Sequence, residues 1–258
     1  MTKWRYLIGS MLVVSSTVNA QEASSETSTK KWQHSIEIYA QALNIRGNST
    51  IGRISTDVDV DPAFIMDHID MGAMLRLEGI YDNQWGYYLD YSYMKLSGKT
   101  DSVLDINKNI LKGNVDIRQG VLEAKGFKRY LYDIGMIDYM VGIRWWDNDI
   151  DTRLYGSKGN VDLRKSLNED WIDYLVGVRW TKELNKSWTV HTSLDMGLGS
   201  DTDFTSSLLT GVRYQINDWS DLNLAYKSTW VDYENKGTFE YDTATQGFLV
   251  GVGQLIFD

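Results

Sequence analysis

Residues 137–146 read Ile-Asp-Tyr-Met-Val-Gly-Ile-Arg-Trp-Trp, and the same pattern returns at residues 172–181 as Ile-Asp-Tyr-Leu-Val-Gly-Val-Arg-Trp-Thr. A shorter copy, Leu-Thr-Gly-Val-Arg-Tyr, lies at 209–214, and a degraded one, Leu-Val-Gly-Val-Gly-Gln, at 249–254. In the two full copies every second residue is apolar or aromatic, and the residues between them include the charges and the glycine. Since side chains alternate between the two faces of a β-strand, the repeat predicts strands with one apolar and one polar face.

Strands of this kind are typical of a barrel in a membrane. About ten residues of tilted strand cross the ~30 Å hydrocarbon layer. An apolar face toward lipid and a polar face toward the lumen is the pattern of a transmembrane β-barrel. The predicted fold class is therefore all-β, an antiparallel up-and-down transmembrane β-barrel. Because alternation does not reveal which face points inward, a soluble periplasmic barrel with an apolar interior is the alternative.

The two full copies also predict a strand register. Antiparallel pairing that places Asp138 opposite Arg179 also places Arg144 opposite Asp173, because the two pairs of residue numbers have the same sum. Directly opposed unlike charges stabilise a sheet by roughly 0.2–1 kcal/mol per pair. We expect two ion pairs facing the lumen; the alternative is that these charges only line a hydrated lumen.

The composition excludes several classes of protein. The chain of 258 residues has no Cys, one Pro and a formal net charge of −9, so a nucleic-acid partner, which needs a basic surface, is not expected. The absence of Cys fits a chain that crosses an oxidising compartment without disulfides. No apolar run reaches about 18 residues, so an inner-membrane helix is not expected.

Residues 1–20 have the features of a secretory signal peptide. Lys3 and Arg5 give a basic start, residues 7–14 are mostly apolar, and Ala20 ends the segment with a small residue. We therefore expect cleavage near Ala20, a flexible periplasmic tail over 21–32 and an outer-membrane barrel over 33–258. A short membrane anchor is the alternative, but its apolar stretch would be too short to span a bilayer.

Short and long connections alternate along the barrel segment. The stretches 97–114 and 147–170 are interpreted as long polar loops. Ten strands joined in this way match the short periplasmic turns and longer extracellular loops of outer-membrane barrels, with twelve strands as the first alternative and eight as a more distant one. Short turns are expected near Asn83, Arg129, Asn185 and Asn217, and long connections near Asn48, Asp105, Ser157, Ser200 and Lys236.

Residues 48–68 depart from the regular pattern. Residues 51–60 alternate weakly, which indicates a possible extra strand. Asp61 and Pro62 predict the N-cap and first turn of a short helix over residues 61–68. Phe64, Ile65 and Ile69 give this helix an apolar side, so it would either cap the barrel mouth or fold into the lumen.

The alternation of faces also predicts which charged residues line the lumen and which aromatic residues form girdles on the outer surface. A ten-stranded barrel is only slightly wider than the eight-stranded barrels that side chains fill, so lumen charges could close the lumen or tune ion selectivity. The charged residues expected to line it are Arg76, Glu78, Asp90, Asp138, Arg144, Asp173, Arg179, Asp195 and Arg213. The aromatic girdles are expected from Trp85, Trp180, Trp188, Tyr214 and Trp219 at the lower interface and from Trp145, Trp171 and Trp230 at the upper one.

Several of these segments carry a resemblance. Residues 58–62 (Val-Asp-Val-Asp-Pro), 69–73 (Ile-Asp-Met-Gly-Ala), 86–96, 170–173 (Asp-Trp-Ile-Asp) and the Gly-Val-Arg-aromatic repeats resemble a family of Gram-negative outer-membrane β-barrel proteins described as porin-like. The resemblance covers most of the chain after the signal peptide. It implies location and fold but assigns no catalytic residue. The chain departs from the pattern where Asp258 follows the terminal Phe257 and where Gly253 replaces the arginine of the repeat.

Two further groups could carry chemistry. His191, Ser193 and Asp195 share one strand face, as in a hydrolase, but residues two apart on a strand stand roughly 6–7 Å apart, too far for a nucleophile–base hydrogen bond. A lining role is therefore expected. Acidic clusters at residues 57–61 and 147–151 lack the central glycine and final glutamate of a calcium loop, so solvated loops are expected and no metal or cofactor is predicted.

These features predict a monomeric, non-enzymatic outer-membrane barrel of a Gram-negative bacterium. It would be porin-like, a narrow channel for ions or small solutes. The alternative is a closed-lumen structural or surface-interaction barrel that acts through acidic extracellular loops, and a hydrolase is a distant third. The expected partners are outer-membrane lipid and lipopolysaccharide, with the barrel-assembly machinery during biogenesis.

Overall fold

The structure, a computed structural model, describes residues 32–51, 54–106, 109–156, 162–235 and 239–257. The expected signal peptide and nearly all of the expected tail lie outside this part of the chain. The elements follow in the order β1 (Trp32–Gln41), β2 (Asn44–Ile51), β3 (Ile54–Val60), α1 (Pro62–His68), β4 (Ile69–Tyr81), β5 (Trp85–Ile106), β6 (Asn109–Tyr132), β7 (Gly135–Gly156), β8 (Asp162–Glu183), β9 (Trp188–Gly199), β10 (Thr202–Asn217), β11 (Ser220–Asn235) and β12 (Phe239–Phe257).

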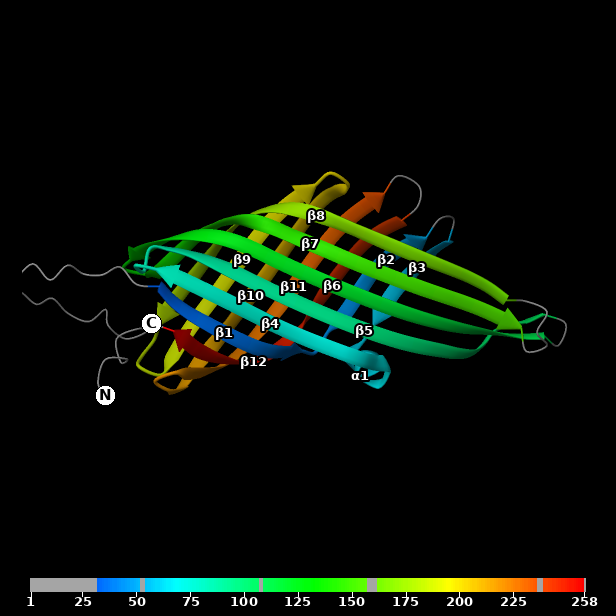
Figure 1. Ribbon diagram of the computed structural model, residues 1–258, viewed down its shortest axis with the longest axis horizontal. Helices are drawn as coiled ribbons and strands as arrows, with labels where there is room; N and C mark the ends of the chain where they lie inside the picture. Colours follow the sequence, from blue (N-terminus) through cyan, green and yellow to red (C-terminus); the bar gives the residue numbers. More distant parts are fainter. Residues whose placement is uncertain (1–31, 52–53, 107–108, 157–161, 236–238, 258) are drawn as a thin grey trace, which may run out of the picture.

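Ten strands close into a barrel. Strands β4 to β12 pair in chain order with antiparallel neighbours, and β1 pairs with both β4 and β12, which closes the ring. This confirms the predicted up-and-down barrel and its ten strands. The start of β1 and the end of β12 lie at the same end of the barrel (Figure 1), which we call the lower end; the opposite end is the upper end.

The hairpin β2–β3 is added to the upper part of the wall. Residues 249–257 of β12 pair with β1, and residues 239–246 of the same strand pair with β2. Thus β2 continues β1 upward after a break at Ala42 and Leu43, and β3 folds back on β2. The weakly alternating segment 51–60 therefore contributes a strand that stands outside the closed ring.

The predicted register of β7 and β8 is confirmed. Asp138 is opposite Arg179, and Arg144 is opposite Asp173. The repeated motif therefore forms two adjacent strands whose charged faces are in step and point inward.

An apolar outer surface surrounds the barrel. The outward side chains Val141, Tyr174 and Phe248 are 65%, 67% and 73% exposed, although all three lie on a fully paired sheet. Such a surface on a closed sheet defines a membrane-spanning β-barrel, because a soluble barrel would place these side chains in its core. Aromatic residues near the strand ends are exposed or half-buried on this outer surface. They include Trp32, Trp85, Trp180, Trp188, Tyr214 and Trp219 at the lower end, with Trp145, Phe204 and Trp230 at the upper end.

The expected position of Trp171 in the upper girdle is wrong. Its side chain is 5% exposed and stacks on Tyr233 at a ring distance of 3.9 Å, inside the barrel. The physical reason is the strand period itself, since outward Ile172 and inward Asp173 leave Trp171 on the inner face.

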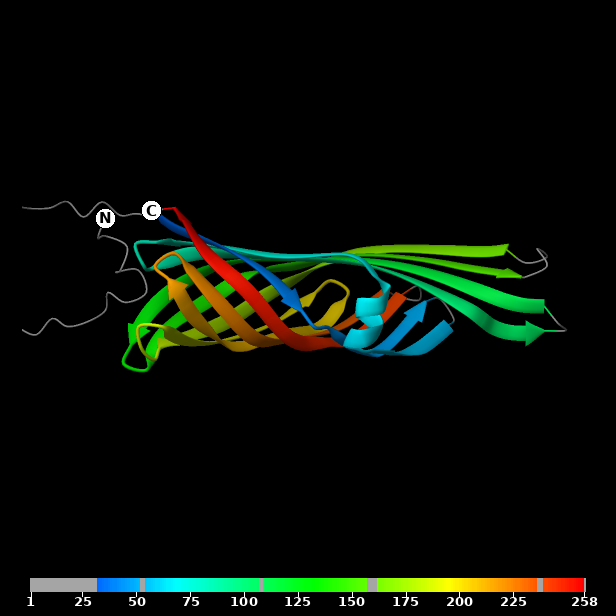
Figure 2. The ribbon, with the colours of Figure 1, turned by 90° about the horizontal axis from the view of Figure 1, so that it is seen from below.

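The strands β5 to β8 extend beyond the rest of the barrel at the upper end (Figure 2), so the loops expected at 97–114 and 147–170 are wrong. In this extension the polarity of the two faces is inverted. Ile117, Ile150 and Leu167 point inward and pack in apolar clusters, whereas Arg118 on the outer face pairs with Asp149. Water in place of lipid outside the extension explains the inversion.

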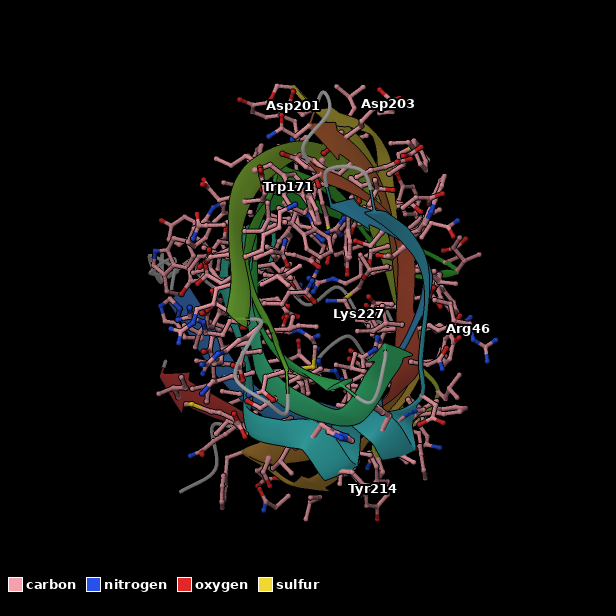
Figure 3. The ribbon with its side chains drawn as sticks, turned by 90° about the vertical axis from the view of Figure 1, so that its right-hand side faces the viewer. Arg46, Trp171, Asp201, Asp203, Tyr214 and Lys227 are labelled. Atoms are coloured by element: carbon pink, nitrogen blue, oxygen red, sulfur yellow. The ribbon has the colours of Figure 1, made fainter. Side chains whose placement is uncertain are left out.

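The predicted helix is confirmed, but its expected position across the mouth or in the lumen is not. The Asp61 side chain caps α1 by accepting a hydrogen bond from the Phe64 amide at 2.7 Å, and Pro62 occupies the first turn. Seen along the barrel from its upper end (Figure 3), α1 lies at the wall of the barrel next to β5, with Ile65 buried and Phe64 and Met66 exposed. Within the described ranges, no helix has the length and apolar character needed to cross a membrane.

Candidate functional site

The lumen contains a network of ion pairs. Its members come from nine of the ten barrel strands, and their formal charges cancel, so the network has no excess charge to attract ions of one sign. Figure 3 shows Lys227 pointing into this space and Tyr214 pointing away from it. Seven basic side chains, Arg76, Lys125, Arg129, Arg144, Arg179, Arg213 and Lys227, are paired with seven acidic ones, Glu37, Glu78, Asp90, Glu123, Asp138, Asp195 and Asp221.

Near the lower end, the carboxylate of Asp138 is held by two arginines. Arg129 donates from Nε and Nη2 at 2.7 and 2.9 Å, and Arg179 donates from Nε and Nη2 at 2.9 and 2.7 Å. Arg179 also donates to both oxygens of Glu78 at 2.6 and 2.9 Å. The predicted ion pair of Asp138 with Arg179 is thus confirmed, as part of a four-residue cluster.

At mid-height, Arg76 bridges two carboxylates. It donates to Asp90 from Nε and Nη2 at 2.9 and 2.8 Å and to Glu37 from Nη1 at 3.0 Å. The hydroxyls of Tyr39 and Tyr88 donate to the same Asp90 carboxylate at 2.6 and 2.8 Å. Every polar atom of this cluster that carries charge is therefore paired, which buried ions require.

Beside it, Glu123 and Asp195 bind three cations. Lys125 donates to Glu123 at 2.5 Å and to Asp195 at 2.6 Å, and Lys227 donates to Glu123 at 3.1 Å. Arg144 donates to Asp195 at 2.8 Å and to the hydroxyl of Thr205 on β10 at 2.9 Å. Arg144 is completely buried, so this cluster blocks the lumen where it lies.

The second predicted ion pair is wrong in its partner. Although Arg144 is opposite Asp173 in the sheet, its guanidinium hydrogen-bonds across the lumen to Asp195 on β9. Asp173 instead accepts a hydrogen bond from the indole nitrogen of Trp146 at 2.9 Å. In a narrow lumen, a long side chain can reach a strand that is not its neighbour. The residue directly opposite in the sheet therefore does not decide which ion pair forms.

The glycines of the repeat leave room for this network. A Cβ on Gly251 would lie 2.6 Å from Oε1 of Glu37, and one on Gly177 would lie 2.9 Å from Cβ of Asp195. A Cβ on Gly142 would collide with the Ala124 carbonyl and with Lys125. The repeat therefore alternates a charge that fills the lumen with a glycine that makes space for a charge from the neighbouring strand.

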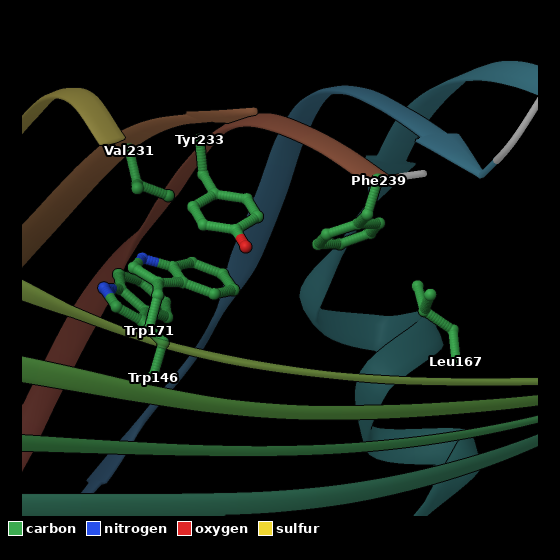
Figure 4. Close-up of a cluster of buried hydrophobic side chains, with 6 residues drawn as sticks. All are labelled: Trp146, Leu167, Trp171, Val231, Tyr233 and Phe239. Atoms are coloured by element: carbon green, nitrogen blue, oxygen red, sulfur yellow. The ribbon is translucent and has the colours of Figure 1, made fainter. Parts of the chain in front are cut away.

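An aromatic layer closes the lumen above the ions. Trp171 stacks on Trp146 and on Tyr233, at ring distances of 5.5 and 3.9 Å (Figure 4). Phe239 and Leu167 continue the same buried cluster toward the upper extension. An ion that crosses the barrel would have to displace both a paired ionic layer and an apolar one.

Two of the cavities in the described part of the chain lie inside the barrel and border the ionic network. The larger, about 360 Å³, lies in the lower half and is lined by network members such as Arg76, Arg179 and Arg213 and by apolar side chains such as Ile80 and Leu209. The smaller, about 50 Å³, is lined by apolar side chains such as Leu43, Met94 and Trp146 and by polar ones that include Glu123 and Lys227. The lumen thus has a lower vestibule, which half of the network lines, and a small upper pocket, which reaches Glu123 and Lys227.

The structure places the side chains of all nine expected lumen charges on the inner face, with Arg213 at the vestibule. Sequence reasoning did not single out Lys227 or Arg129, although the alternation of their strands carries that signal. His191 is hydrogen-bonded to Asn223 at 2.9 Å and Asp195 to two cations, so neither serves Ser193 as a catalytic partner. Among the described residues there is no group of three or more His, Cys, Asp or Glu placed to hold a metal ion.

No protein-family model and no curated protein matches the chain. Solved structures with a similar course of the chain include the outer membrane protease OmpT from Escherichia coli (TM-score 0.49, 8% identity, 88% of this chain and 98% of that one). Others are the translocator domain of the autotransporter NalP from Neisseria meningitidis (0.47, 12%, 86% and 88%) and the attachment invasion locus protein Ail of Yersinia pestis (0.34, 10%, 88% and 99%).

Proposed function

We propose that this protein is a non-enzymatic, closed-lumen barrel of a Gram-negative outer membrane that acts at the cell surface through its upper extension. The observation that carries the proposal is the double closure of the lumen by the ion-pair network and the aromatic layer. Strands β5 to β8, each 22 to 24 residues long, supply the surface at which it would act. Such strands exceed the roughly 10 residues that a membrane crossing needs.

The proposed orientation places the lower end in the periplasm. Short turns at the lower end and longer projections at the upper end are the arrangement of outer-membrane barrels. The acidic side chains Asp201 and Asp203 lie on the outside of the upper rim (Figure 3). We further propose that the protein is a monomer, that divalent ions bridge this rim to lipopolysaccharide, and that the assembly machinery recognises the segment ending in Phe257.

A narrow channel is the second candidate function, and the lower vestibule of about 360 Å³ favours it. Ion conductance of the refolded barrel in a planar bilayer separates the two. The closed-lumen proposal expects no steady conductance steps from inserted protein, whereas the double variant Arg144→Ala, Trp171→Ala, which shortens one side chain in each closing layer, is expected to leak. Reproducible steps from the unaltered protein would contradict the closed lumen and establish a water path.

A further inference from the structure

One border of the upper extension is a strand edge with a neighbour on one side only. Strand β8 pairs with β7 from Asp162 onward, but its pairing with β9 begins at Asp173. Within the described ranges, residues 162–172 therefore pair with β7 alone, and we call them the free edge of β8. This edge forms the border of the extension (Figure 1). Because backbone groups of a strand point alternately to its two neighbours, the free edge offers a row of N–H and C=O groups to a further strand.

The free edge of β8 lacks the usual protections of such strands. Proline, a bulge or a short length commonly prevents an edge from pairing. The free edge contains no proline, and its pairing with β7 has no register shift. On its outer face Ser166, Asn168 and Asp170 are exposed, so water surrounds it. The edge is therefore open to the addition of an extended strand, a common mode of recognition.

A second copy of the free edge fits this one in a single register. When the two copies overlap completely as antiparallel strands, Leu167 is opposite itself, because it is the middle residue. On the outer face, this register places Arg164 opposite Asp170. On the inner face, it places Lys165 opposite Glu169, and symmetry repeats both pairs. Directly opposed unlike charges stabilise a strand pair, whereas like charges destabilise it, so the sequence of the free edge is complementary to itself.

Other registers lose this match. Sliding the copy by two residues in either direction places Lys165 opposite an apolar residue, Leu167 or Trp171. Sliding it by one residue brings hydrogen-bonding residues opposite non-bonding ones, which an antiparallel ladder does not allow. An inward-pointing charge such as Lys165 also discourages pairing with unrelated apolar strands. The partner that the free edge selects is therefore the same edge of another copy.

We propose that the free edge of β8 binds the free edge of a second copy whose barrel stands in the outer membrane of an adjacent cell. The inference rests on the proposed function and names the partner of the upper extension. Strand pairing would join the two extensions into one continuous sheet between the cells. The contact is short, so its strength comes from the many copies that two cell surfaces bring together.

The direction of β8 requires that the two copies stand in different membranes. The strand runs from the upper end at Asp162 to the lower end at Glu183. An antiparallel partner must run the opposite way. Two copies in one membrane both run downward, and strands tilted by roughly 35–45° from the barrel axis cannot become antiparallel by rotation about the membrane normal. A copy in an opposing membrane is inverted and meets the requirement, which agrees with a monomer in its own membrane.

Charge reversal at the outer pair provides the test. The full chain is displayed on cells of a Gram-negative host with truncated lipopolysaccharide, and clustering is measured by sedimentation and microscopy. The unaltered protein is expected to cluster the cells. Arg164→Asp and Asp170→Arg each place like charges opposite one another twice, so cells with either variant alone are expected to stay dispersed. The double variant Arg164→Asp, Asp170→Arg restores unlike pairs and is expected to cluster the cells again.

A mixture of the two single variants separates pairing from a general effect of charge. Arg164→Asp in one copy and Asp170→Arg in the other restore unlike charges at both positions. Cells of the two populations, marked with fluorescent proteins of different colours, are therefore expected to form mixed clusters. Arg118→Asp is the matched control, because Arg118 is exposed on the outer face of β6, away from the free edge. This variant is expected to cluster cells as the unaltered protein does.

The outcomes separate this inference from the function on which it rests. Heat-dependent mobility in electrophoresis verifies the folded barrel, and thiol labelling of Asn168→Cys on intact cells measures display of the extension. A displayed, unaltered protein that leaves cells dispersed would overturn the pairing alone. Clustering by either single variant, no clustering by their mixture, or dispersal by Arg118→Asp would also overturn it. An extension that the label cannot reach on intact cells, or steady conductance of the unaltered barrel, would contradict the proposed function itself.

Discussion

At the scale of the residue, the stability of the barrel depends on the pairing of buried charges. Asp138 is 1% exposed and accepts four hydrogen bonds from Arg129 and Arg179. Asp138→Asn would leave Arg129 without its carboxylate, and breaking a buried pair from one side costs about 3–5 kcal/mol. We expect a loss near the lower value, because Arg179 retains Glu78. Urea unfolding in lipid vesicles, followed by tryptophan fluorescence, measures it.

The control is Asp170→Asn, which removes the same charge from an exposed position. Its effect on the unfolding free energy should be small, as is usual for surface charges. Equal losses for the two variants would contradict the view that burial gives Asp138 its importance. The alternation of faces along each strand was enough to predict that these charges face the lumen. It could not predict the contact of Arg144 with Asp195, because that contact joins β7 to β9, which are not neighbouring strands.

At the scale of the element, the register of β7 and β8 is set by the outward residues as much as by the inward charges. Val141 is opposite Val176, and both face lipid. Because the chain has no Cys, the double variant Val141→Cys, Val176→Cys should form an internal disulfide on oxidation, since opposed Cβ atoms are about 4.5–5.5 Å apart. Intact mass after thiol alkylation measures it. The pair Val141→Cys, Tyr174→Cys should stay reduced, since diagonal neighbours are about 7–8 Å apart; preferential oxidation of that pair would show a shifted register.

The elements also show which parts of the fold the sequence could reveal. Within the membrane, apolar side chains face lipid and charged side chains face the lumen, and this alternation made the ten strands predictable. The helix cap at Asp61 was predictable from Asp61 followed by Pro62. In the extension of β5 to β8 the alternation continues with its polarity inverted, as Ile150 inward and Asp149 outward show. A search for strands with apolar outward residues therefore interprets these strands as polar loops. The same inversion explains why Trp171 was expected on the outer face although its side chain points inward.

At the scale of the whole molecule, charge is sorted by height. The lumen network is neutral, whereas several carboxylates lie close together at the upper rim. Asp232 lies beyond Trp230 on β11, outside the apolar belt. Partial burial, together with the carboxylates of Asp242, Asp203, Glu240 and Glu234, raises the pKa of Asp232 above its ordinary range. Repulsion among the rim carboxylates therefore makes their full ionisation unfavourable. Divalent cations that bind to the rim would relieve this repulsion and would bridge the rim to anionic lipid.

The raised pKa of Asp232 predicts how the stability of the barrel depends on pH. A carboxyl whose pKa is higher in the folded than in the unfolded protein binds its proton more tightly when folded, so it reduces stability as the pH rises from its ordinary pKa through the raised one. Asp232→Asn should therefore stabilise the barrel at pH 7, by less than about 1 kcal/mol because the group is largely solvated. The gain should vanish below the ordinary pKa of aspartate, where both proteins are uncharged at this position.

The free energies of unfolding of the two proteins, measured at pH 7 and at an acidic pH, test this prediction. Added Mg²⁺ should narrow the difference between them at pH 7 by neutralising the remaining carboxylates. A variant that is less stable than the unaltered protein at pH 7 would show that Asp232 makes a favourable contact that outweighs the repulsion of the rim.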